Sequence, residues 1–207
     1  MHRTLIAERT LTAGVAHELH PPPAGLHAQA QWAQRAANAG ERAAAPDQLI
    51  AAAARYARRA DAVPTLARLD AARFDPTAQP PLALADFADL LMQDVQHAAF
   101  ARRIALETDL QPLTPRVEPD ALAIALTNLL GTAVHYGRRC MRLEARAPPD
   151  GRALLAVRDD GPDVPPAERQ RLFDRFFRGD GADNGTGSGL GLALVKRVAK
   201  LHGGSIA

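Results

Sequence analysis

A stretch containing three prolines, residues 74–81, separates two parts of the chain that follow different patterns. Before it, helix-forming residues recur at near-helical spacing over residues 4–39 and again over residues 47–69. After it, helical and extended patterns alternate. The change of pattern predicts two domains joined by a linker, which we assign to residues 1–73 and 74–207.

The N-terminal part predicts an antiparallel helical hairpin. Residues 39–46 contain turn formers, so we expect the turn between the two helices there. A hairpin of this size buries too little apolar surface to be stable alone. We therefore expect two copies to pair as a four-helix bundle, which makes the protein a homodimer.

The C-terminal part predicts an α/β sandwich, so the overall fold class is α+β. The last two expected strands flank a turn of Pro, Asp and Gly at residues 148–151. The expected helices cover residues 86–101, 119–135 and 193–201, and the expected strands cover residues 104–110, 140–147 and 153–158.

Composition excludes several classes of function. The net charge is only +2 over 207 residues and the arginines are scattered, so we expect no nucleic-acid partner. Cys140 is the single cysteine, which excludes an internal disulfide and fits a reducing compartment. No apolar run is long enough to span a bilayer. We expect a cytoplasmic segment without membrane contact, and any membrane anchor of a parent protein would lie upstream of Met1.

A glycine-rich run over residues 185–192 leads directly into a helical pattern. Glycines at alternate positions let backbone amides approach a phosphate chain, and the helix N-terminus adds a favourable partial charge. The run lacks the Gly-Lys-Ser/Thr of a Walker loop, and no strand precedes it as in a Rossmann fingerprint. A flexible linker is the alternative, but a linker is not normally followed at once by Leu-Gly-Leu and a helix.

A second polar motif, residues 157–165, places Asp159, Asp160 and Gly161 at the end of an expected strand. A carboxylate there can accept a hydrogen bond from an exocyclic amine, and glycine lets a flat ring come close. Taken alone, an ordinary turn of Asp, Gly and Pro explains this motif more often.

The order of these motifs resembles that of the sensor histidine kinases. Their N, G1, F and G2 boxes are similar to Asn128-Leu129-Leu130, Asp159-Asp160-Gly161-Pro162, Leu172-Phe173-Asp174-Arg175-Phe176-Phe177-Arg178-Gly179 and Gly187-Ser188-Gly189-Leu190-Gly191-Leu192. Their H box is similar to Ala16-His17-Glu18-Leu19 with Pro22, and the end of their second hairpin helix to Leu66-Ala67-Arg68-Leu69-Asp70. The resemblance covers nearly the whole chain.

The resemblance implies that His17 accepts a phosphoryl group from ATP and passes it to an aspartate on a response-regulator receiver domain. Neutral imidazole is a competent nucleophile near pH 7, and Glu18 can orient the ring and take its other proton. Read without the family, a histidine beside a glutamate is usually an ordinary solvated pair.

The resemblance also implies a nucleotide site of the Bergerat type, binding ATP with Mg²⁺. Asp159 would hold the adenine amine above Gly161, Asn128 would face metal or phosphate, and His135 would contact phosphate. Phe173, Phe176 and Phe177 would anchor the base of a lid at residues 179–185, or simply pack in the core. The full expected nucleotide-binding set is Asn128, Thr132, His135, Tyr136, Asp159, Gly161, Phe173, Phe177, Arg178, Gly187, Gly189, Leu190 and Gly191, with Asn128 and Thr132 also as metal ligands.

Several positions depart from the family pattern. Thr132 stands where a second asparagine usually binds magnesium, and Asp163 stands where glycine is common. Pro21 and Pro23 lie just after His17 and can unwind a helical turn. The family ordinarily continues with another strand beyond Ala207, so we expect the last strand of the catalytic domain to be missing.

These departures keep two other functions open. The first is a catalytically weak or inactive relative that serves as a dimeric signalling scaffold. The second is an ATP hydrolase of the same nucleotide fold, which the absence of a glutamate at the position of Asn128 makes less favourable, because water attack needs a positioned base.

Overall fold

The computed structural model describes residues 30–31, 34–35, 38–148, 152–179 and 188–206. Leu66–Gly179 and Gly189–Ala207 form one compact unit, and α3 as far as Thr65 belongs to another. The elements in chain order are α3 (Ala39–Ala71), η1 (Pro76–Ala78), α4 (Leu84–Ala101), β1 (Ala105–Leu110), α5 (Pro119–Tyr136), β2 (Cys140–Arg146), β3 (Leu154–Asp159), α6 (Pro166–Arg169), η2 (Arg171–Phe173) and α7 (Gly191–Leu201).

The long helix α3 corrects one expectation. The turn predicted at residues 39–46 is wrong, because α3 begins at Ala39 and continues through Pro46 and Pro64. Residues 41–45 are strong helix formers, and the fixed φ of proline is itself helical, so each proline removes one hydrogen bond without ending the helix. The first helix of the predicted hairpin falls largely on residues 1–29, outside the described residues.

The sheet contains three strands in the order β1-β2-β3. β1 pairs with β2 in parallel, with Glu107 opposite Arg142, and α5 provides the crossover that a parallel pair requires. β2 pairs with β3 in antiparallel fashion, with Met141 opposite Asp159. The β1–α5–β2 unit therefore carries a helix directly across one face of the sheet.

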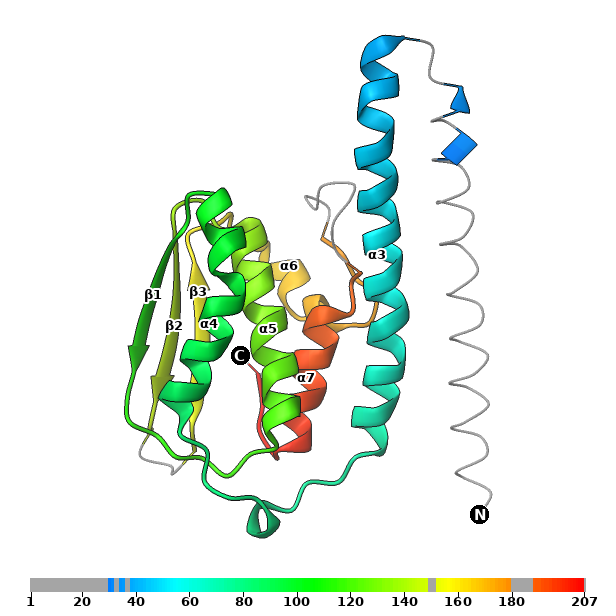
Figure 1. The fold of residues 1–207 in the computed structure, drawn as a ribbon. Coiled ribbons are helices and arrows are strands. Elements are labelled where there is room, and N and C mark those ends of the chain that lie inside the picture. Colours follow the sequence, from blue (N-terminus) through cyan, green and yellow to red (C-terminus); the bar gives the residue numbers. More distant parts are fainter. Residues whose placement is uncertain (1–29, 32–33, 36–37, 149–151, 180–187, 207) are drawn as a thin grey trace, which may run out of the picture. The chain divides into compact units, whose positions relative to one another are not determined.

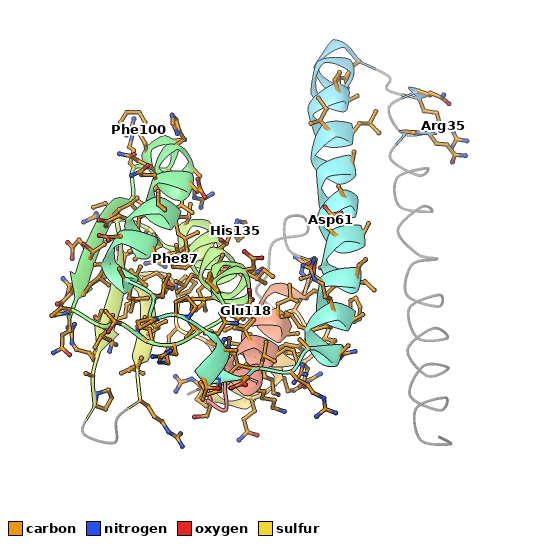
Figure 2. The ribbon with its side chains drawn as sticks, turned by 60° about the horizontal axis from the view of Figure 1, so that its bottom comes forward. Arg35, Asp61, Phe87, Phe100, Glu118 and His135 are labelled. Carbon is orange, nitrogen blue, oxygen red and sulfur yellow. The ribbon has the colours of Figure 1, made fainter. Side chains whose placement is uncertain are left out.

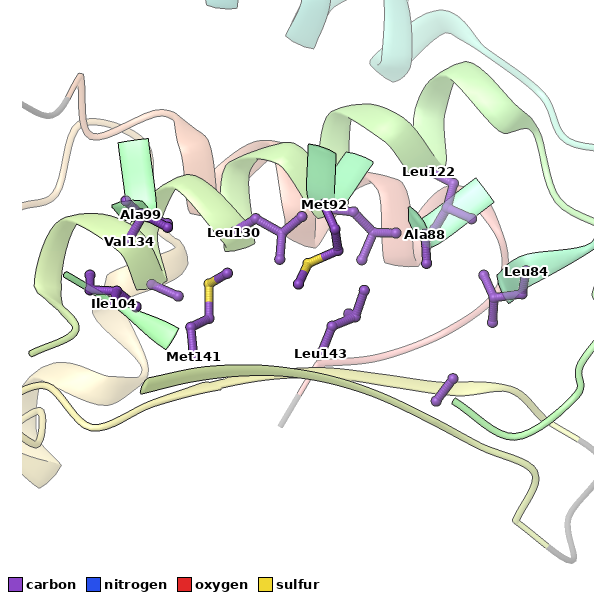
Figure 3. Packing of buried hydrophobic residues seen from close by; sticks show 13 residues of the cluster. Leu84, Ala88, Met92, Ala99, Ile104, Leu122, Leu130, Val134, Met141 and Leu143 are labelled. Carbon is purple, nitrogen blue, oxygen red and sulfur yellow. The ribbon is translucent and has the colours of Figure 1, made fainter. Parts of the chain in front are cut away.

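Helices α4 and α5 cover that face, as Figure 1 shows. The β2 residues that face them are completely buried, namely Met141, Leu143 and Ala145. They meet Leu126 and Leu130 of α5 in a single apolar cluster (Figure 3). Burial of these side chains stabilises the unit by roughly 1.5–3 kcal/mol for each large residue.

Helix α7 packs against α5 and completes the helical layer. Its buried residues are Ala193, Leu194, Val195 and Val198. His202, just after α7, accepts a hydrogen bond at Nε2 from the Glu118 backbone amide at 3.0 Å. Since Glu118 is also the N-cap of α5, the end of α7 is fastened to the start of α5.

The opposite face of the sheet carries charged side chains. Arg142 pairs with Glu107 across β1 and β2 at 2.6 Å, and Arg158 pairs with Glu144 across β2 and β3 at 2.9 Å. The hydrogen bond from Arg142 holds the pKa of Glu107 below its usual value. Exposed pairs of this kind contribute little to stability.

The predicted α+β class is confirmed. The helix expected at residues 86–101 and the strands expected at residues 140–147 and 153–158 lie within two residues of the observed α4, β2 and β3. Among the described helices, none combines the length and the apolar character that a membrane crossing requires.

Candidate nucleotide site

Asn128 and Thr132 lie one turn apart on α5, and both are half-buried. The Asn128 side-chain amide donates to the Ile124 carbonyl oxygen at 2.7 Å, and the Thr132 hydroxyl donates to the Asn128 carbonyl oxygen at 2.7 Å. Each side chain directs a donor to the α5 backbone, and the oxygens Oδ1 and Oγ1 carry lone pairs that can accept a hydrogen bond or bind a cation.

The start of α7 lies directly against Asn128. A β-carbon built at Gly191 would stand 2.6 Å from Asn128 Oδ1, so glycine lets the Asn128 side chain lie against the helix start without shifting. The preceding residue, Leu190, occupies the N-cap position without any side-chain cap. Asn128 Oδ1 therefore lies beside a helix N-terminus, where backbone amides and the helix dipole favour a phosphate group.

The Leu190 side chain itself is fully buried. It belongs to the core, so a contact of this residue with nucleotide is restricted to its backbone. Gly187 lies outside the described residues.

The end of β3 brings Asp159 to the same helical layer. Residues 155 and 157 pack against the core, and strand alternation places Asp159 on their side of the sheet. Its Oδ1 accepts a hydrogen bond from the Gly161 amide at 2.8 Å. A β-carbon at Gly161 would stand 2.6 Å from the Tyr136 carbonyl oxygen, so glycine lets this turn lie against the end of α5.

Asp160 has a different role from its neighbour. Its Oδ1 accepts hydrogen bonds from the backbone amides of Arg138 at 2.7 Å and Arg139 at 2.9 Å. These backbone hydrogen bonds, that from Arg139 foremost, lower the pKa of Asp160 to about 2. Asp160 thus holds the connection between α5 and β2, and Asp159 is the carboxylate left for a ligand.

His135 and Tyr136 form the last turn of α5, where their rings meet edge to face at 4.6 Å. The His135 carbonyl oxygen accepts from Arg102 at 2.8 Å. His135 and Glu118 mark the two ends of this helix in Figure 2.

The segment after β3 contains the predicted phenylalanines. Phe173 and Phe177 are half-buried, and the Arg171 guanidinium stacks over the Phe177 ring at 4.3 Å from its centroid. Phe176 is the exposed member, and its amide donates to the Gly189 carbonyl oxygen at 2.8 Å. The F-box and G2-box segments therefore meet backbone to backbone.

Asp163, which departs from the family's usual glycine, forms an exposed ion pair with Arg169 at 2.9 Å. It also accepts a hydrogen bond from the Val164 amide at 2.8 Å. Its negative charge is therefore balanced by an arginine from the short helix α6.

The donor set fits a nucleotide with Mg²⁺. Within the described part of the chain, no group of three or more His, Cys, Asp or Glu side chains is arranged to hold a metal. Mg²⁺ in nucleotide sites commonly takes one or two protein oxygens and completes its shell with water and phosphate. Asn128 Oδ1, beside the phosphate-compatible start of α7, suits that arrangement.

Comparisons with known proteins identify the family. Residues 117–207 match the family described as histidine kinase-, DNA gyrase B- and HSP90-like ATPase. The chain is 34% identical over its whole length to the sensor protein kinase PmrB of Pseudomonas aeruginosa. A mycobacterial sensor histidine kinase, MprB, has a solved structure that is 30% identical, with a TM-score of 0.54, covering 61% of this chain and 81% of that one. The chain belongs to the sensor histidine kinases.

The chain corresponds to only part of some relatives and to most of others. This histidine kinase chain spans 43% of the length of PmrB. The Acinetobacter baumannii histidine kinase AdeS, at 16% identity and a TM-score of 0.66, shares the fold and covers 89% of this chain and 86% of its own.

The expected site residues of this histidine kinase divide into two groups. In the first group, Asn128 lies close to Gly191, and both Tyr136 and Asp159 lie close to Gly161. His17 and Glu18 lie outside the described residues, so their roles stay predictions. The loop-holding role of Asp160 was missed, although its position opposite the start of β2 follows once the antiparallel pairing is known.

Proposed function

We propose that the chain autophosphorylates His17 with ATP and transfers the phosphoryl group to an aspartate on a response-regulator receiver domain. The observation that carries this proposal is the close approach of Asn128 Oδ1 to the start of α7 at Gly191. A side-chain oxygen beside a helix N-terminus is suited to a phosphate chain with its cation. Membership of the sensor histidine kinases supports the reaction class.

The nucleotide would lie along the end of α5. Asp159 would accept a hydrogen bond from the adenine amine, and the first amides of α7 would bind phosphate oxygens. Asn128 and, through water, Thr132 would hold Mg²⁺, while His135 and Arg178 supply positive charge or donors near the phosphates. The metal, when bound, neutralises charge that builds up on the phosphate oxygens during transfer.

The transfer itself needs little from the protein beyond positioning. One ring nitrogen of neutral His17 forms a bond to the γ-phosphorus as the bond from that phosphorus to the ADP oxygen breaks. The proton on the other ring nitrogen passes to Glu18, which also orients the ring. ADP leaves with the electrons of the broken bond. The receiver aspartate later takes the phosphoryl group from the imidazole.

We also propose the setting of this reaction. The predicted hairpin of residues 1–73 would pair with a second copy, so that the phosphoacceptors lie on a four-helix bundle. The segment would lie in the cytoplasm as part of a longer sensor protein, as the relatives named as sensors suggest.

A catalytically weak scaffold is the second candidate, and one observation favours it. The Thr132 hydroxyl, which replaces the family's asparagine, uses its proton on the Asn128 carbonyl oxygen and offers a poorer ligand than an amide. Nucleotide titration separates the two candidates. A kinase binds nucleotide more tightly when Mg²⁺ is present, whereas a scaffold shows no metal-dependent tightening.

The kinase proposal is tested by incubating the protein with γ-labelled ATP and Mg²⁺ and then challenging the label with acid and with base. Label that is lost in acid and retained in base marks a phosphohistidine. Steady phosphate release that persists in a His17→Ala variant would instead indicate an ATP hydrolase.

A further inference from the structure

The last turn of α3 takes part in a cluster of three charged side chains, Asp70, Arg175 and Arg197. Asp70 Oδ2 accepts from the Arg175 guanidinium at 2.8 Å, and Asp70 Oδ1 lies 2.8 Å from Arg197 Nε. The Asp70 carbonyl oxygen accepts a further hydrogen bond from Arg197 at 3.0 Å. One carboxylate therefore joins residues 105 and 127 positions away in the sequence.

The cluster is shielded from water more than an ordinary surface pair. The Asp70 side chain is 29% exposed and the Arg197 side chain 25% exposed. Arg197 Nε is buried and meets Asp70 as an ion pair without an aligned hydrogen bond. Removal of the carboxylate would leave two guanidinium groups close together, one of them with a buried and uncompensated atom.

Arg175 connects Asp70 to the nucleotide site through its neighbour Phe176. Phe176 has a φ of 63°, which is unusual for a bulky residue, and its amide donates to the Gly189 carbonyl oxygen at 2.8 Å. A backbone in this region persists only when its surroundings hold it there. Gly189 is one of those supports, and Asp70 holds the neighbouring residue, Arg175.

Arg197 connects Asp70 to the same site by a second route. It lies on α7, whose first residue, Gly191, faces Asn128. The Asp70 carboxylate thus fixes the segment that meets Gly189 and, at the same time, the helix that begins two residues later.

We propose that Asp70 is a positioning residue for the nucleotide site, acting through Arg175 and Arg197 and not by touching the nucleotide. The inference rests on the proposed function only in that it takes the region of Asn128 and Gly191 as the place of nucleotide binding. Loss of the Asp70 charge displaces the Phe176–Gly189 junction and the start of α7, and nucleotide affinity falls.

The test measures the dissociation constant of a fluorescent ADP analogue on the full chain, with thermal unfolding of each variant alongside. Asp70→Asn is expected to weaken binding by roughly fivefold to tenfold, and Arg175→Gln by less, because the contact between Asp70 and Arg197 remains in that variant. The double variant should bind no more weakly than Asp70→Asn alone, because the loss of Asp70 already removes the contact with Arg175. Asp70→Glu keeps the charge and should restore part of the affinity. The matched control is Asp61→Asn, an exposed carboxylate on the same helix, which should bind as the unsubstituted chain does.

The outcomes separate this inference from the proposed kinase activity. Unchanged affinity in Asp70→Asn, with or without a lower melting temperature, overturns the positioning role and leaves the kinase proposal standing. Weakened binding in a chain that never labels His17 supports the positioning role and overturns the kinase proposal. A chain that binds no nucleotide at all overturns both.

Discussion

Phe176 and Gly189 both have left-handed backbone conformations, with φ of 63° and 70°, and the amide of the first donates to the carbonyl oxygen of the second at 2.8 Å. A β-carbon at Gly189 would lie 2.7 Å from Phe176 Cα. The two segments that the sequence assigned to the F and G2 boxes are therefore joined through their backbones, and glycine is required at the junction.

This contact predicts the effect of Gly189→Ala. The left-handed conformation alone costs an alanine roughly 1–2 kcal/mol, and overpacking against Phe176 adds about 1–3 kcal/mol. Gly203→Ala is the matched control, because Gly203 has the same φ of 70° and nothing within 4 Å of its added β-carbon. Urea unfolding should show the larger loss for Gly189→Ala. Equal losses would mean that the contact with Phe176 relaxes freely.

Asp160 predicts a dependence of stability on pH. Its pKa falls from 3.8 to about 2 in the folded chain, so its carboxylate stabilises the fold fully above about pH 4, and this stabilisation is lost as the pH falls from 4 towards 2. Asp160→Asn should therefore lower the urea midpoint at pH 7 and differ little from the unsubstituted chain at pH 2.

Asp89→Asn, an exposed carboxylate on α4, serves as the control for Asp160 and should show no such difference at either pH. A stability difference between Asp160→Asn and the parent chain that stays constant from pH 7 to pH 2 would argue against the hydrogen bonds from the Arg138 and Arg139 amides as its source.

Substitutions at Thr132 should change how strongly Mg²⁺ tightens ADP binding. We expect Thr132→Val, which keeps the shape and removes the hydroxyl, to reduce the metal-dependent tightening of ADP binding by up to about tenfold, as loss of a water-mediated ligand does. Thr132→Asn should increase the tightening. Binding measured in EDTA should stay the same in both variants. If Mg²⁺ affects all three proteins equally, Thr132 is not near the metal.

His202 should contribute to stability at the start of α5. Its Nε2 accepts from the Glu118 amide, so Nδ1 carries the proton and donates to the Val198 carbonyl oxygen at 2.9 Å. His202→Ala removes both bonds and should lower the free energy of unfolding by about 1–3 kcal/mol. His97→Ala, at an exposed position on α4, should be neutral in the same thermal melt. A neutral His202→Ala would show that water replaces both bonds.

The local sequence pattern predicted where the helices and strands lie better than it predicted which strands pair with each other. The helix at residues 86–101 and the strands after Cys140 followed from periodicity, since each depends on neighbouring residues. The parallel pairing of β1 with β2 did not, because alternation along one strand carries no information on its partner. The glycine and proline at residues 39–46 led to a wrong prediction of a turn, because α3 continues through these residues.

The same limit applies to the site. The sequence placed Asp159 and Asp160 together at a strand end, but only the register of β3 against β2 separates the one that faces α5 from the one that holds the α5–β2 connection. Asp70 was noted as the close of a helix, and its two arginine partners lie more than a hundred residues away, beyond any spacing rule.

The most direct test of the kinase proposal compares His17→Ala with His20→Ala after incubation with γ-labelled ATP and Mg²⁺. The two histidines lie three residues apart in the same predicted helix, so a general loss of folding would affect both variants alike. If His17 is the phosphoacceptor, acid-labile, base-stable label appears on the unsubstituted chain and on His20→Ala, and none appears on His17→Ala. Label that survives in His17→Ala, or a folded dimer that binds nucleotide with Mg²⁺ and takes up no label, would contradict the proposal.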